Sequence, residues 1–113
     1  MRGDADRLRD MLEMCDLLVA HASDREVLRR DPVVQAAAQR WLEVLGEAAT
    51  HVSVEVKESA SDVPWKELMG IRVILAHAYH HVDGDIVGSV VADHIPRVAH
   101  VVRAILADHD LDE

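Results

Sequence analysis

The fold is decided by one long stretch, DPVVQAAAQRWLEVLGEAAT, which covers residues 31–50. The pattern predicts a helix, because Asp31 is a good N-cap and Pro32 suits the first helical position. The β-branched residues 51–56 have no strand partner elsewhere in the sequence, so we interpret them as the fraying end of this helix. Gly46 lowers helix stability by about 1 kcal/mol relative to alanine, which favours close packing against another helix as its purpose. The apolar stripe of the helix consists of Val33, Val34, Ala37, Trp41, Leu45 and Ala48.

Helical spacing of apolar residues recurs on both sides of this stretch. Ser23 and Glu26 have the spacing of a capping box, so a short helix is expected to follow Ser23 and to end at Arg30. Pro96 lies inside the last apolar pattern and should kink that helix, because proline cannot donate a backbone hydrogen bond. The sequence therefore predicts an all-α fold, an up-and-down bundle of four main helices plus one short helix. The main helices are expected over residues 4–22, 31–56, 64–82 and 86–106, with a loop at 57–63 and a helix break at Asp83-Gly84.

Length and composition limit the class of protein. The 113 residues are enough for a single domain over residues 1–113, and half of them are hydrophobic, which argues against disorder. Acidic residues outnumber basic ones by 21 to 12, so the chain cannot coat nucleic acid through a broad basic surface, although a local cleft could still bind RNA. Cys15 has no partner for a disulfide, the charged N-terminus does not resemble a signal peptide, and no apolar run approaches about 20 residues. We expect a soluble cytoplasmic protein with no membrane contact.

A second stretch, IRVILAHAYHH at residues 71–81, places polar side chains on an otherwise apolar helix. His77 follows Arg72 by five residues, so on a straight helix the two point about 140° apart around the axis. Tyr79 follows Arg72 by seven residues and lies nearly in line with it. Arg72 and His77 can therefore act together only if the helix ends near His77 or if a second copy of the chain supplies the missing group.

These residue types suit chemistry at a phosphate group. The planar guanidinium of Arg72 can pair with two phosphate oxygens at once, and His77 can move a proton near neutral pH. A histidine that deprotonates a ribose 2′-hydroxyl beside such an arginine would cleave RNA without a metal ion. An arginine and a histidine at this spacing also occur by chance, so a surface arginine and a hydrogen-bonded histidine at a helix end stay open as the alternative.

Five short segments, taken in order and spacing, resemble the HepT-like toxins of the HEPN superfamily. These toxins are small helical proteins with an Arg-x4–6-His motif, to which the HepT branch adds a tyrosine two residues after the histidine. The resemblance covers about residues 31–106. The segments are LGEAA at 45–49, VPW at 63–65, GIR at 70–72, HAY at 77–79 and VD at 82–83.

The resemblance implies an activity, a partner and a mode of control. It implies the toxin of a type VII toxin–antitoxin system, a metal-independent endoribonuclease that works on RNA as a homodimer with both motifs lining one cleft. Arg72 and His77 match the catalytic positions of the family. Tyr79 matches the tyrosine to which an MntA-like nucleotidyltransferase antitoxin transfers AMP. AMP on Tyr79 would put a bulky anion beside Arg72 and occupy its charge.

The motif departs from the HEPN pattern at one position. HEPN proteins usually carry a polar residue, most often asparagine, directly after the arginine, whereas this chain has Val73. Valine can neither hold a phosphate nor orient a histidine. Two alternatives to a fully active nuclease therefore stay open, a weakly active enzyme and an inactive helical dimer that serves as a binding partner of a nucleotidyltransferase.

The eight histidines also raise the possibility of a metal site. His77 and His81 lie four residues apart, a helical spacing that can bind Zn²⁺, and His80 is a third candidate. However, no acid follows His77 as in an HExxH motif, and further ligands would have to come from His51 or Asp85. We expect no metal centre and no cofactor. The solvent face of the last helix is the expected place of His94, His100 and His109.

Overall fold

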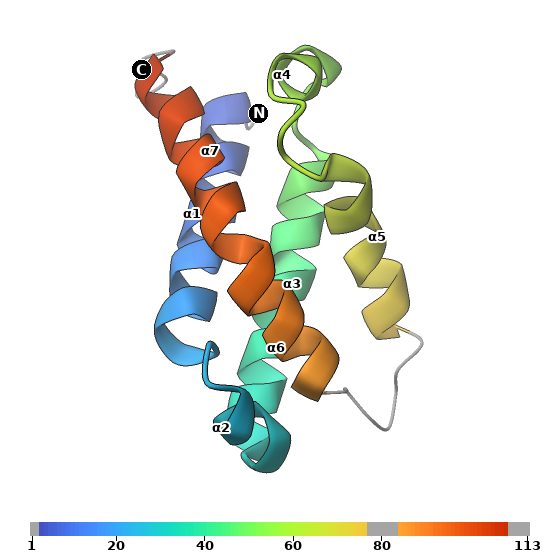
Figure 1. The fold of residues 1–113 in the computed structure, drawn as a ribbon. Coiled ribbons are helices and arrows are strands. Elements are labelled where there is room, and N and C mark those ends of the chain that lie inside the picture. Colours follow the sequence, from blue (N-terminus) through green and yellow to red (C-terminus); the bar gives the residue numbers. More distant parts are fainter. Residues whose placement is uncertain (1–2, 77–83, 109–113) are drawn as a thin grey trace.

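The structure of the protein, a computed structural model, describes residues 3–76 and 84–108. For residues 72–76 and 84–86 it describes the backbone alone. Every regular element in these ranges is a helix, so the predicted all-α fold is confirmed (Figure 1). None of the described helices is both long and apolar enough to cross a lipid bilayer. The helices are α1 (Asp4–His21), α2 (Arg25–Arg30), α3 (Pro32–Thr50), α4 (Val54–Ser59), α5 (Trp65–Ala76), α6 (Gly84–Asp93) and α7 (Ile95–Asp108).

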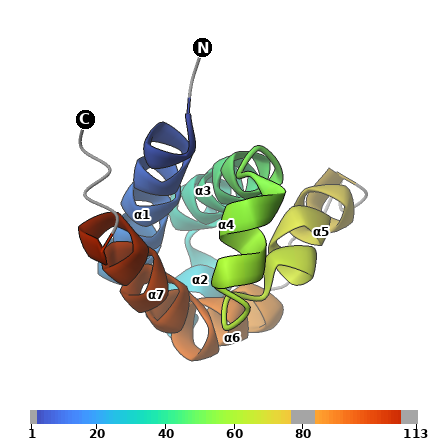
Figure 2. The same ribbon diagram turned by 90° about the horizontal axis from the view of Figure 1, so that it is seen from above.

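Helix α3 lies in the middle of the bundle. It packs against α1 on one side and against α5 on the other, and α7 covers a further face of α1 (Figure 2). The short α2 packs on both α6 and α3. In Figure 1, α2, the start of α6 and the end of α5 all lie at the lower end of the molecule, opposite the chain termini.

The core is made of aliphatic side chains from the long helices, as expected from a chain without phenylalanine. Burial raises the pKa of the Cys15 thiol to about 12, with a further contribution from the neighbouring Asp16 carboxylate, so this thiol stays protonated at neutral pH. No charged side chain is buried in the described part of the chain. Core members with almost no exposed surface include Leu8, Met11, Cys15, Leu18, Leu45, Ile95 and Val102.

The central helix is shorter than predicted. α3 ends at Thr50, and residues 51–56 are not its fraying end, because Ser53 begins the separate helix α4. The Ser53 hydroxyl accepts a hydrogen bond from the Val56 amide at 3.3 Å, and the Asp4 carboxylate accepts hydrogen bonds from the Ser53 amide and hydroxyl at 2.9 and 2.7 Å. This contact across 49 residues of sequence fixes the turn, and local pattern alone could not reveal it.

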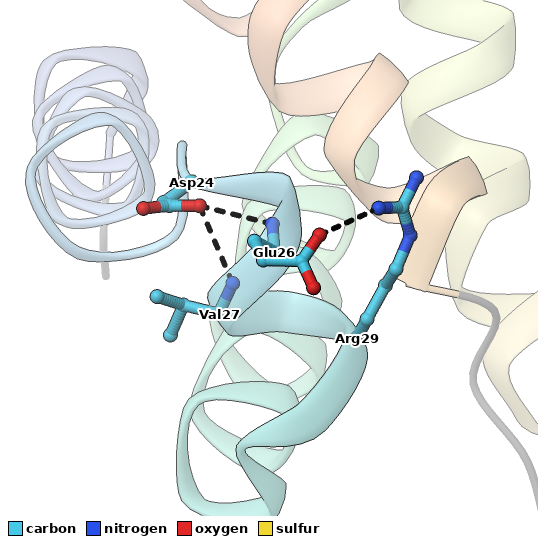
Figure 3. Close-up of polar contacts among 4 residues, drawn as sticks. All are labelled: Asp24, Glu26, Val27 and Arg29. Carbon is cyan, nitrogen blue, oxygen red and sulfur yellow. Dashed lines mark hydrogen bonds and ion pairs between the residues drawn. The ribbon is translucent and has the colours of Figure 1, made fainter.

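The N-cap of the short second helix also differs from the prediction by one residue. Asp24, not Ser23, caps α2, and its carboxylate accepts hydrogen bonds from the amides of Glu26 and Val27 at 2.9 and 3.3 Å (Figure 3). The helix ends at Arg30, as predicted. The Glu26 carboxylate does not form the predicted capping box with Ser23 and instead pairs with Arg29 at 2.8 Å.

The last predicted helix is divided into α6 and α7 at His94. Pro96 is the second residue of α7 and has no amide hydrogen to donate to the carbonyl four residues earlier, which explains the break. The chain still turns helically there, because the His94 amide donates to Val90 O and the Val98 amide donates to His94 O, both at 3.0 Å. The predicted kink is therefore a short interruption between two helices.

Two members of the predicted stripe on α3 are not in the core, Val33 and the half-buried Ala37. Val33, in the first turn of the helix, is 76% exposed, whereas Leu45 is fully buried. Leu42, which the stripe omitted, is buried as well. The prediction is wrong at the first turn, because the periodic pattern does not show where neighbouring helices stop covering a helix end.

Candidate functional site

Helix α5, which carries Arg72, is fixed at its first residue by a buried tryptophan. Trp65 is only 8% exposed, and its indole Nε1–H donates a hydrogen bond to the Ala60 carbonyl at 3.0 Å. The indole therefore ties the start of α5 to the turn that follows α4. Because a helix is stiff over three turns, this contact also fixes the direction in which α5 presents Arg72.

The turn before α5 has its own backbone hydrogen bonds. The Val63 amide donates to Ala60 O at 3.1 Å, and the Trp65 amide donates to Val63 O at 2.8 Å. The Leu68 amide then donates to Pro64 O at 3.0 Å, which is the first helical bond of α5. The segment Val63-Pro64-Trp65, singled out from the sequence, is thus a helix start: a buried valine, a proline that accepts the first bond and the anchoring tryptophan.

Lys57 of α4 joins the ends of two neighbouring helices. Its Nζ lies 3.4 Å from Thr50 O, at the end of α3, and 3.4 Å from the Met69 sulfur on α5. The same ammonium group is 6.0 Å from the centre of the Trp65 ring, at the outer limit of a cation–π contact. The lysine therefore links the end of α3 to the first turns of α5.

The segment LGEAA, residues 45–49, lies on the part of α3 against which neighbouring helices pack. Leu45, Gly46, Ala48 and Ala49 are all buried, and the small side chains let neighbouring helices approach closely. Glu47 lies on the exposed side of α3 and pairs with His51 at 2.9 Å. His51, considered as a metal ligand from the sequence, is thus engaged in a surface hydrogen bond with a carboxylate.

The outer side of α5 is open. α5 packs mainly on α3 and stands at the edge of the bundle, on the far side of α3 from α1 (Figure 2). A Cβ built on Gly70 would meet no atom of the described residues within 4 Å. Nothing in the described part of the protomer therefore requires a glycine two residues before Arg72.

The predicted site residues lie at the end of α5 and beyond it. Arg72 and Val73 are on the helical backbone of α5, and their side chains lie outside the described part of the structure. His77 and Tyr79, together with the metal candidates His80 and His81, fall within residues 77–83, outside the described residues. The structure fixes the elements on both sides of the site, α5 and α6, and the approach of Arg72 to His77 stays a prediction.

Helix α2 brings positive charge to the same end of the bundle. Arg25 begins α2, and its side chain crosses Gly88 of α6: a Cβ on that glycine would stand 2.7 Å from Arg25 Cγ. Arg29 pairs with Glu26 (Figure 3). No sequence motif marks these arginines, although the run REVLRR at residues 25–30 holds three of the twelve basic residues of an acidic chain.

The histidines of the described residues are at the surface. His94 and His100 are exposed, which confirms their predicted place, and His109 lies outside the described residues. No group of three or more His, Cys, Asp or Glu side chains suited to a metal ion is present within residues 3–71 and 87–108, whose side chains are described.

Comparison with known protein families assigns the chain. The sequence profile described as "Ribonuclease HepT-like" matches residues 5–105, nearly the whole described structure. The chain belongs to the HepT-like ribonuclease family. The resemblance found from the five sequence segments is therefore confirmed, and the described fold shows that two of them, LGEAA and VPW, serve to place α5.

Similar proteins of this family come from both bacteria and archaea. One, named "Putative RNase", from Caldanaerobacter subterraneus subsp. tengcongensis, is 35% identical over 88% of this chain and 90% of its own length. A "Probable ribonuclease HepT" of Thermococcus cleftensis is 31% identical over 84% of this chain and 88% of its own. A third, a "Putative RNase" of Methanocaldococcus jannaschii, is 28% identical over 87% and 92%. No solved structure gives a significant match.

Replacing the anchoring tryptophan should weaken the fold more than the same change at the other tryptophan. Trp65→Phe keeps a ring but removes the indole donor, so the Ala60 carbonyl keeps only the hydrogen bond from the Val63 amide. We expect a loss of about 1 kcal/mol in the free energy of unfolding. Trp41 is only partly buried and makes no comparable hydrogen bond within the described residues. Urea unfolding followed by circular dichroism measures both variants, and equal losses would show that the indole N–H does not anchor α5.

Proposed function

We propose that the protein is a toxin that cleaves RNA without a metal ion, with Arg72 and His77 as its catalytic residues. Membership of the HepT-like ribonuclease family, together with Arg72, His77 and Tyr79 at that family's motif spacing, is the observation that carries this proposal. The cytoplasm, where RNA is accessible, is the proposed place of action.

The chemistry follows from the residue types. His77 takes the proton of a ribose 2′-hydroxyl, and the 2′-oxygen attacks the adjacent phosphorus. The bond from phosphorus to the 5′-oxygen breaks, leaving a 2′,3′-cyclic phosphate on one fragment and a 5′-hydroxyl, protonated by a general acid, on the other. The guanidinium of Arg72 binds the phosphate oxygens and stabilises the charge that develops on them.

A homodimer would bring the two groups together. If α5 continues through His77, the side chains of Arg72 and His77 point about 140° apart around the helix axis. One protomer could then not bring both groups to the same phosphate. The open side of α5 at the edge of the bundle, with free space around Gly70, supports the close approach of a second copy of this helix. In such a dimer the shared cleft contains two catalytic pairs, each made of the arginine of one protomer and the histidine of its partner.

Val73 supports a second candidate function. An aliphatic residue directly after Arg72 cannot help to hold the phosphate, so a weakly active or inactive dimer that binds a nucleotidyltransferase is the alternative. Control by that partner is part of both proposals. An MntA-like nucleotidyltransferase antitoxin would transfer AMP to Tyr79 and thereby place a phosphate and a nucleoside at the entrance to the cleft.

Removing either catalytic group should abolish RNA cleavage. A positioned general base contributes about 10²–10⁴-fold to a rate, so we expect His77→Ala and Arg72→Ala each to lose at least about 100-fold in cleavage of a fluorescent RNA. Activity of the unmodified protein should persist in EDTA. Matched controls are the exposed His100→Ala and Arg40→Ala. A purified wild type that leaves RNA intact, with and without Mg²⁺, would favour the binding-partner alternative.

Mixing the two inactive variants should restore activity if the cleft is shared. When Arg72→Ala and His77→Ala chains are unfolded together at equal amounts and refolded, half of the dimers contain one of each. One of the two Arg–His pairs in the cleft of such a mixed dimer has both groups intact, so about a quarter of wild-type activity is expected. Each variant refolded alone serves as the control. No recovery in the mixture, despite a dimeric mass by light scattering, would place both groups in one protomer.

The modification of Tyr79 can be read directly from the intact mass. Tyr79 is the only tyrosine in the chain, so tyrosine modification has a single target. Co-expression with a cognate nucleotidyltransferase should add one or more AMP units and stop RNA cleavage. Tyr79→Phe should show neither change and stay active in the presence of the partner. An unchanged mass of the wild type beside a partner shown to be active would contradict the proposed control.

A further inference from the structure

Arg25 is held in place by a glycine on a neighbouring helix. A Cβ built on Gly88 would lie 2.7 Å from Arg25 Cγ, 3.4 Å from its Cδ and 3.5 Å from its Nε. Real Cβ atoms do not come as close as 2.7 Å, so any other residue at position 88 would force the arginine stem to move. The bare backbone of Gly88 thus provides the surface along which the Arg25 side chain extends.

This contact lies about one helical turn from the start of α6, and the segment with the proposed catalytic histidine comes directly before α6 in the sequence. Gly88 is four residues, about one helical turn or 6 Å, from Gly84, the first residue of α6. The segment with His77 and Tyr79 directly precedes Gly84 in the chain. α2, packed against α6, is therefore a near neighbour of the start of α6 (Figure 1). An RNA strand bound at Arg72 and His77 would have to extend past the elements that surround this end of the bundle.

The charges around Arg25 leave its guanidinium available for an anion. The three acidic residues on α2 and at its two ends are all engaged: Asp24 caps α2, Asp31 caps α3 and Glu26 pairs with Arg29. The side chain of Asp85, in the first turn of α6, lies outside the described residues. Arg25 is exposed, and no carboxylate in the described part of the chain forms an ion pair with it. Arg103, in contrast, makes two hydrogen bonds to Asp16 at 2.9 and 3.0 Å.

We propose that Arg25 binds a backbone phosphate of the RNA substrate, one or more nucleotides away from the bond that is cut. The proposal rests on the proposed function, because it takes single-stranded RNA as the substrate. A strand repeats its phosphates at every nucleotide, and a guanidinium fork pairs with two phosphate oxygens at once. For an acidic protein, a few local arginines of this kind are the means by which a polyanion can be held. Gly88 acts as a positioning residue for Arg25.

Binding of an RNA that cannot be cut tests the contact apart from catalysis. The probe is a fluorescent single-stranded RNA of about 20 nucleotides in which every 2′-hydroxyl is methylated, so that no nucleophile is present. We expect Arg25→Gln to raise its Kd about 3- to 10-fold and to lower the slope of log affinity against log salt by about 0.7, the value for one phosphate contact on a single strand. Arg25→Lys should keep the slope. Arg40→Gln, which removes an exposed arginine of α3, should change neither quantity.

The glycine supplies a second variant that leaves every charge in place. Gly→Ala within a helix normally stabilises it, so Gly88→Ala tests the Arg25 stem and not helix formation. We expect it to weaken RNA binding in the same direction as Arg25→Gln. The double variant should bind no more weakly than Arg25→Gln alone, because both changes remove one contact. Additive losses would show that Gly88 affects binding by a route other than Arg25.

Each outcome separates this proposal from the proposed function. An unchanged Kd and salt slope in Arg25→Gln, with folding verified by thermal melting, would overturn the phosphate contact even if the wild type cleaves RNA. A wild type that does not cleave RNA but binds the probe through Arg25 would reject the nuclease and keep the contact. No measurable binding of the probe by the wild type would overturn the contact. A loss of nucleotidyltransferase binding in Arg25→Gln, with RNA binding intact, would show that the residue serves the protein partner.

Discussion

The packing of α3 between α1 and α5 is the constraint on which the rest of the structure depends. The buried residues of α3 are leucines, alanines and one glycine, so neighbouring helices approach its axis closely on two sides. α1 and α7 complete the core on one side. On the other side α5 rests on α3 with little else around it, which is why the helix that carries Arg72 is at the edge of the bundle.

A helix at the edge needs its own means of fixing its direction, and here the fixing contacts are gathered at its start. The Trp65 indole, the Lys57 ammonium group and the hydrogen bond from Leu68 to Pro64 O all act within the first turns of α5. The far end of α5 carries the motif. The contacts that fix α5 are thus separate from the end at which we propose that a second protomer and RNA bind.

The sequence predicted most of this fold and much less of the site. Residues whose environment follows from local pattern, such as the Asp31 cap and the end of α2 at Arg30, were placed correctly. The errors came where contacts between residues distant in sequence determine the structure. Asp4 fixes the start of α4 at Ser53, and the spacing of apolar residues does not indicate this contact. For the site, the motif predicted Arg72, His77 and Tyr79. The profile match over residues 5–105 confirms the family, and the roles of these three residues stay predictions. Arg25 belongs to no recognised motif, and its proposed role follows only from the packing of α2 on α6.

Three glycines inside helices show how the chain divides its sequence between fold and function. Each lowers helix stability by about 1 kcal/mol relative to alanine, so each needs a compensating contact. Gly46 is buried in α3, and close packing of the bundle supplies that contact. Gly70 has empty space beside it, and Gly88 accommodates an exposed arginine, so neither is required by the core. Both flank, on α5 and α6, the segment that carries His77 and Tyr79. Gly70 and Gly88 thus lower helix stability on both sides of the proposed cleft, and core packing does not explain either of them. A second protomer beside Gly70 and a phosphate bound by Arg25 would supply the compensating contacts.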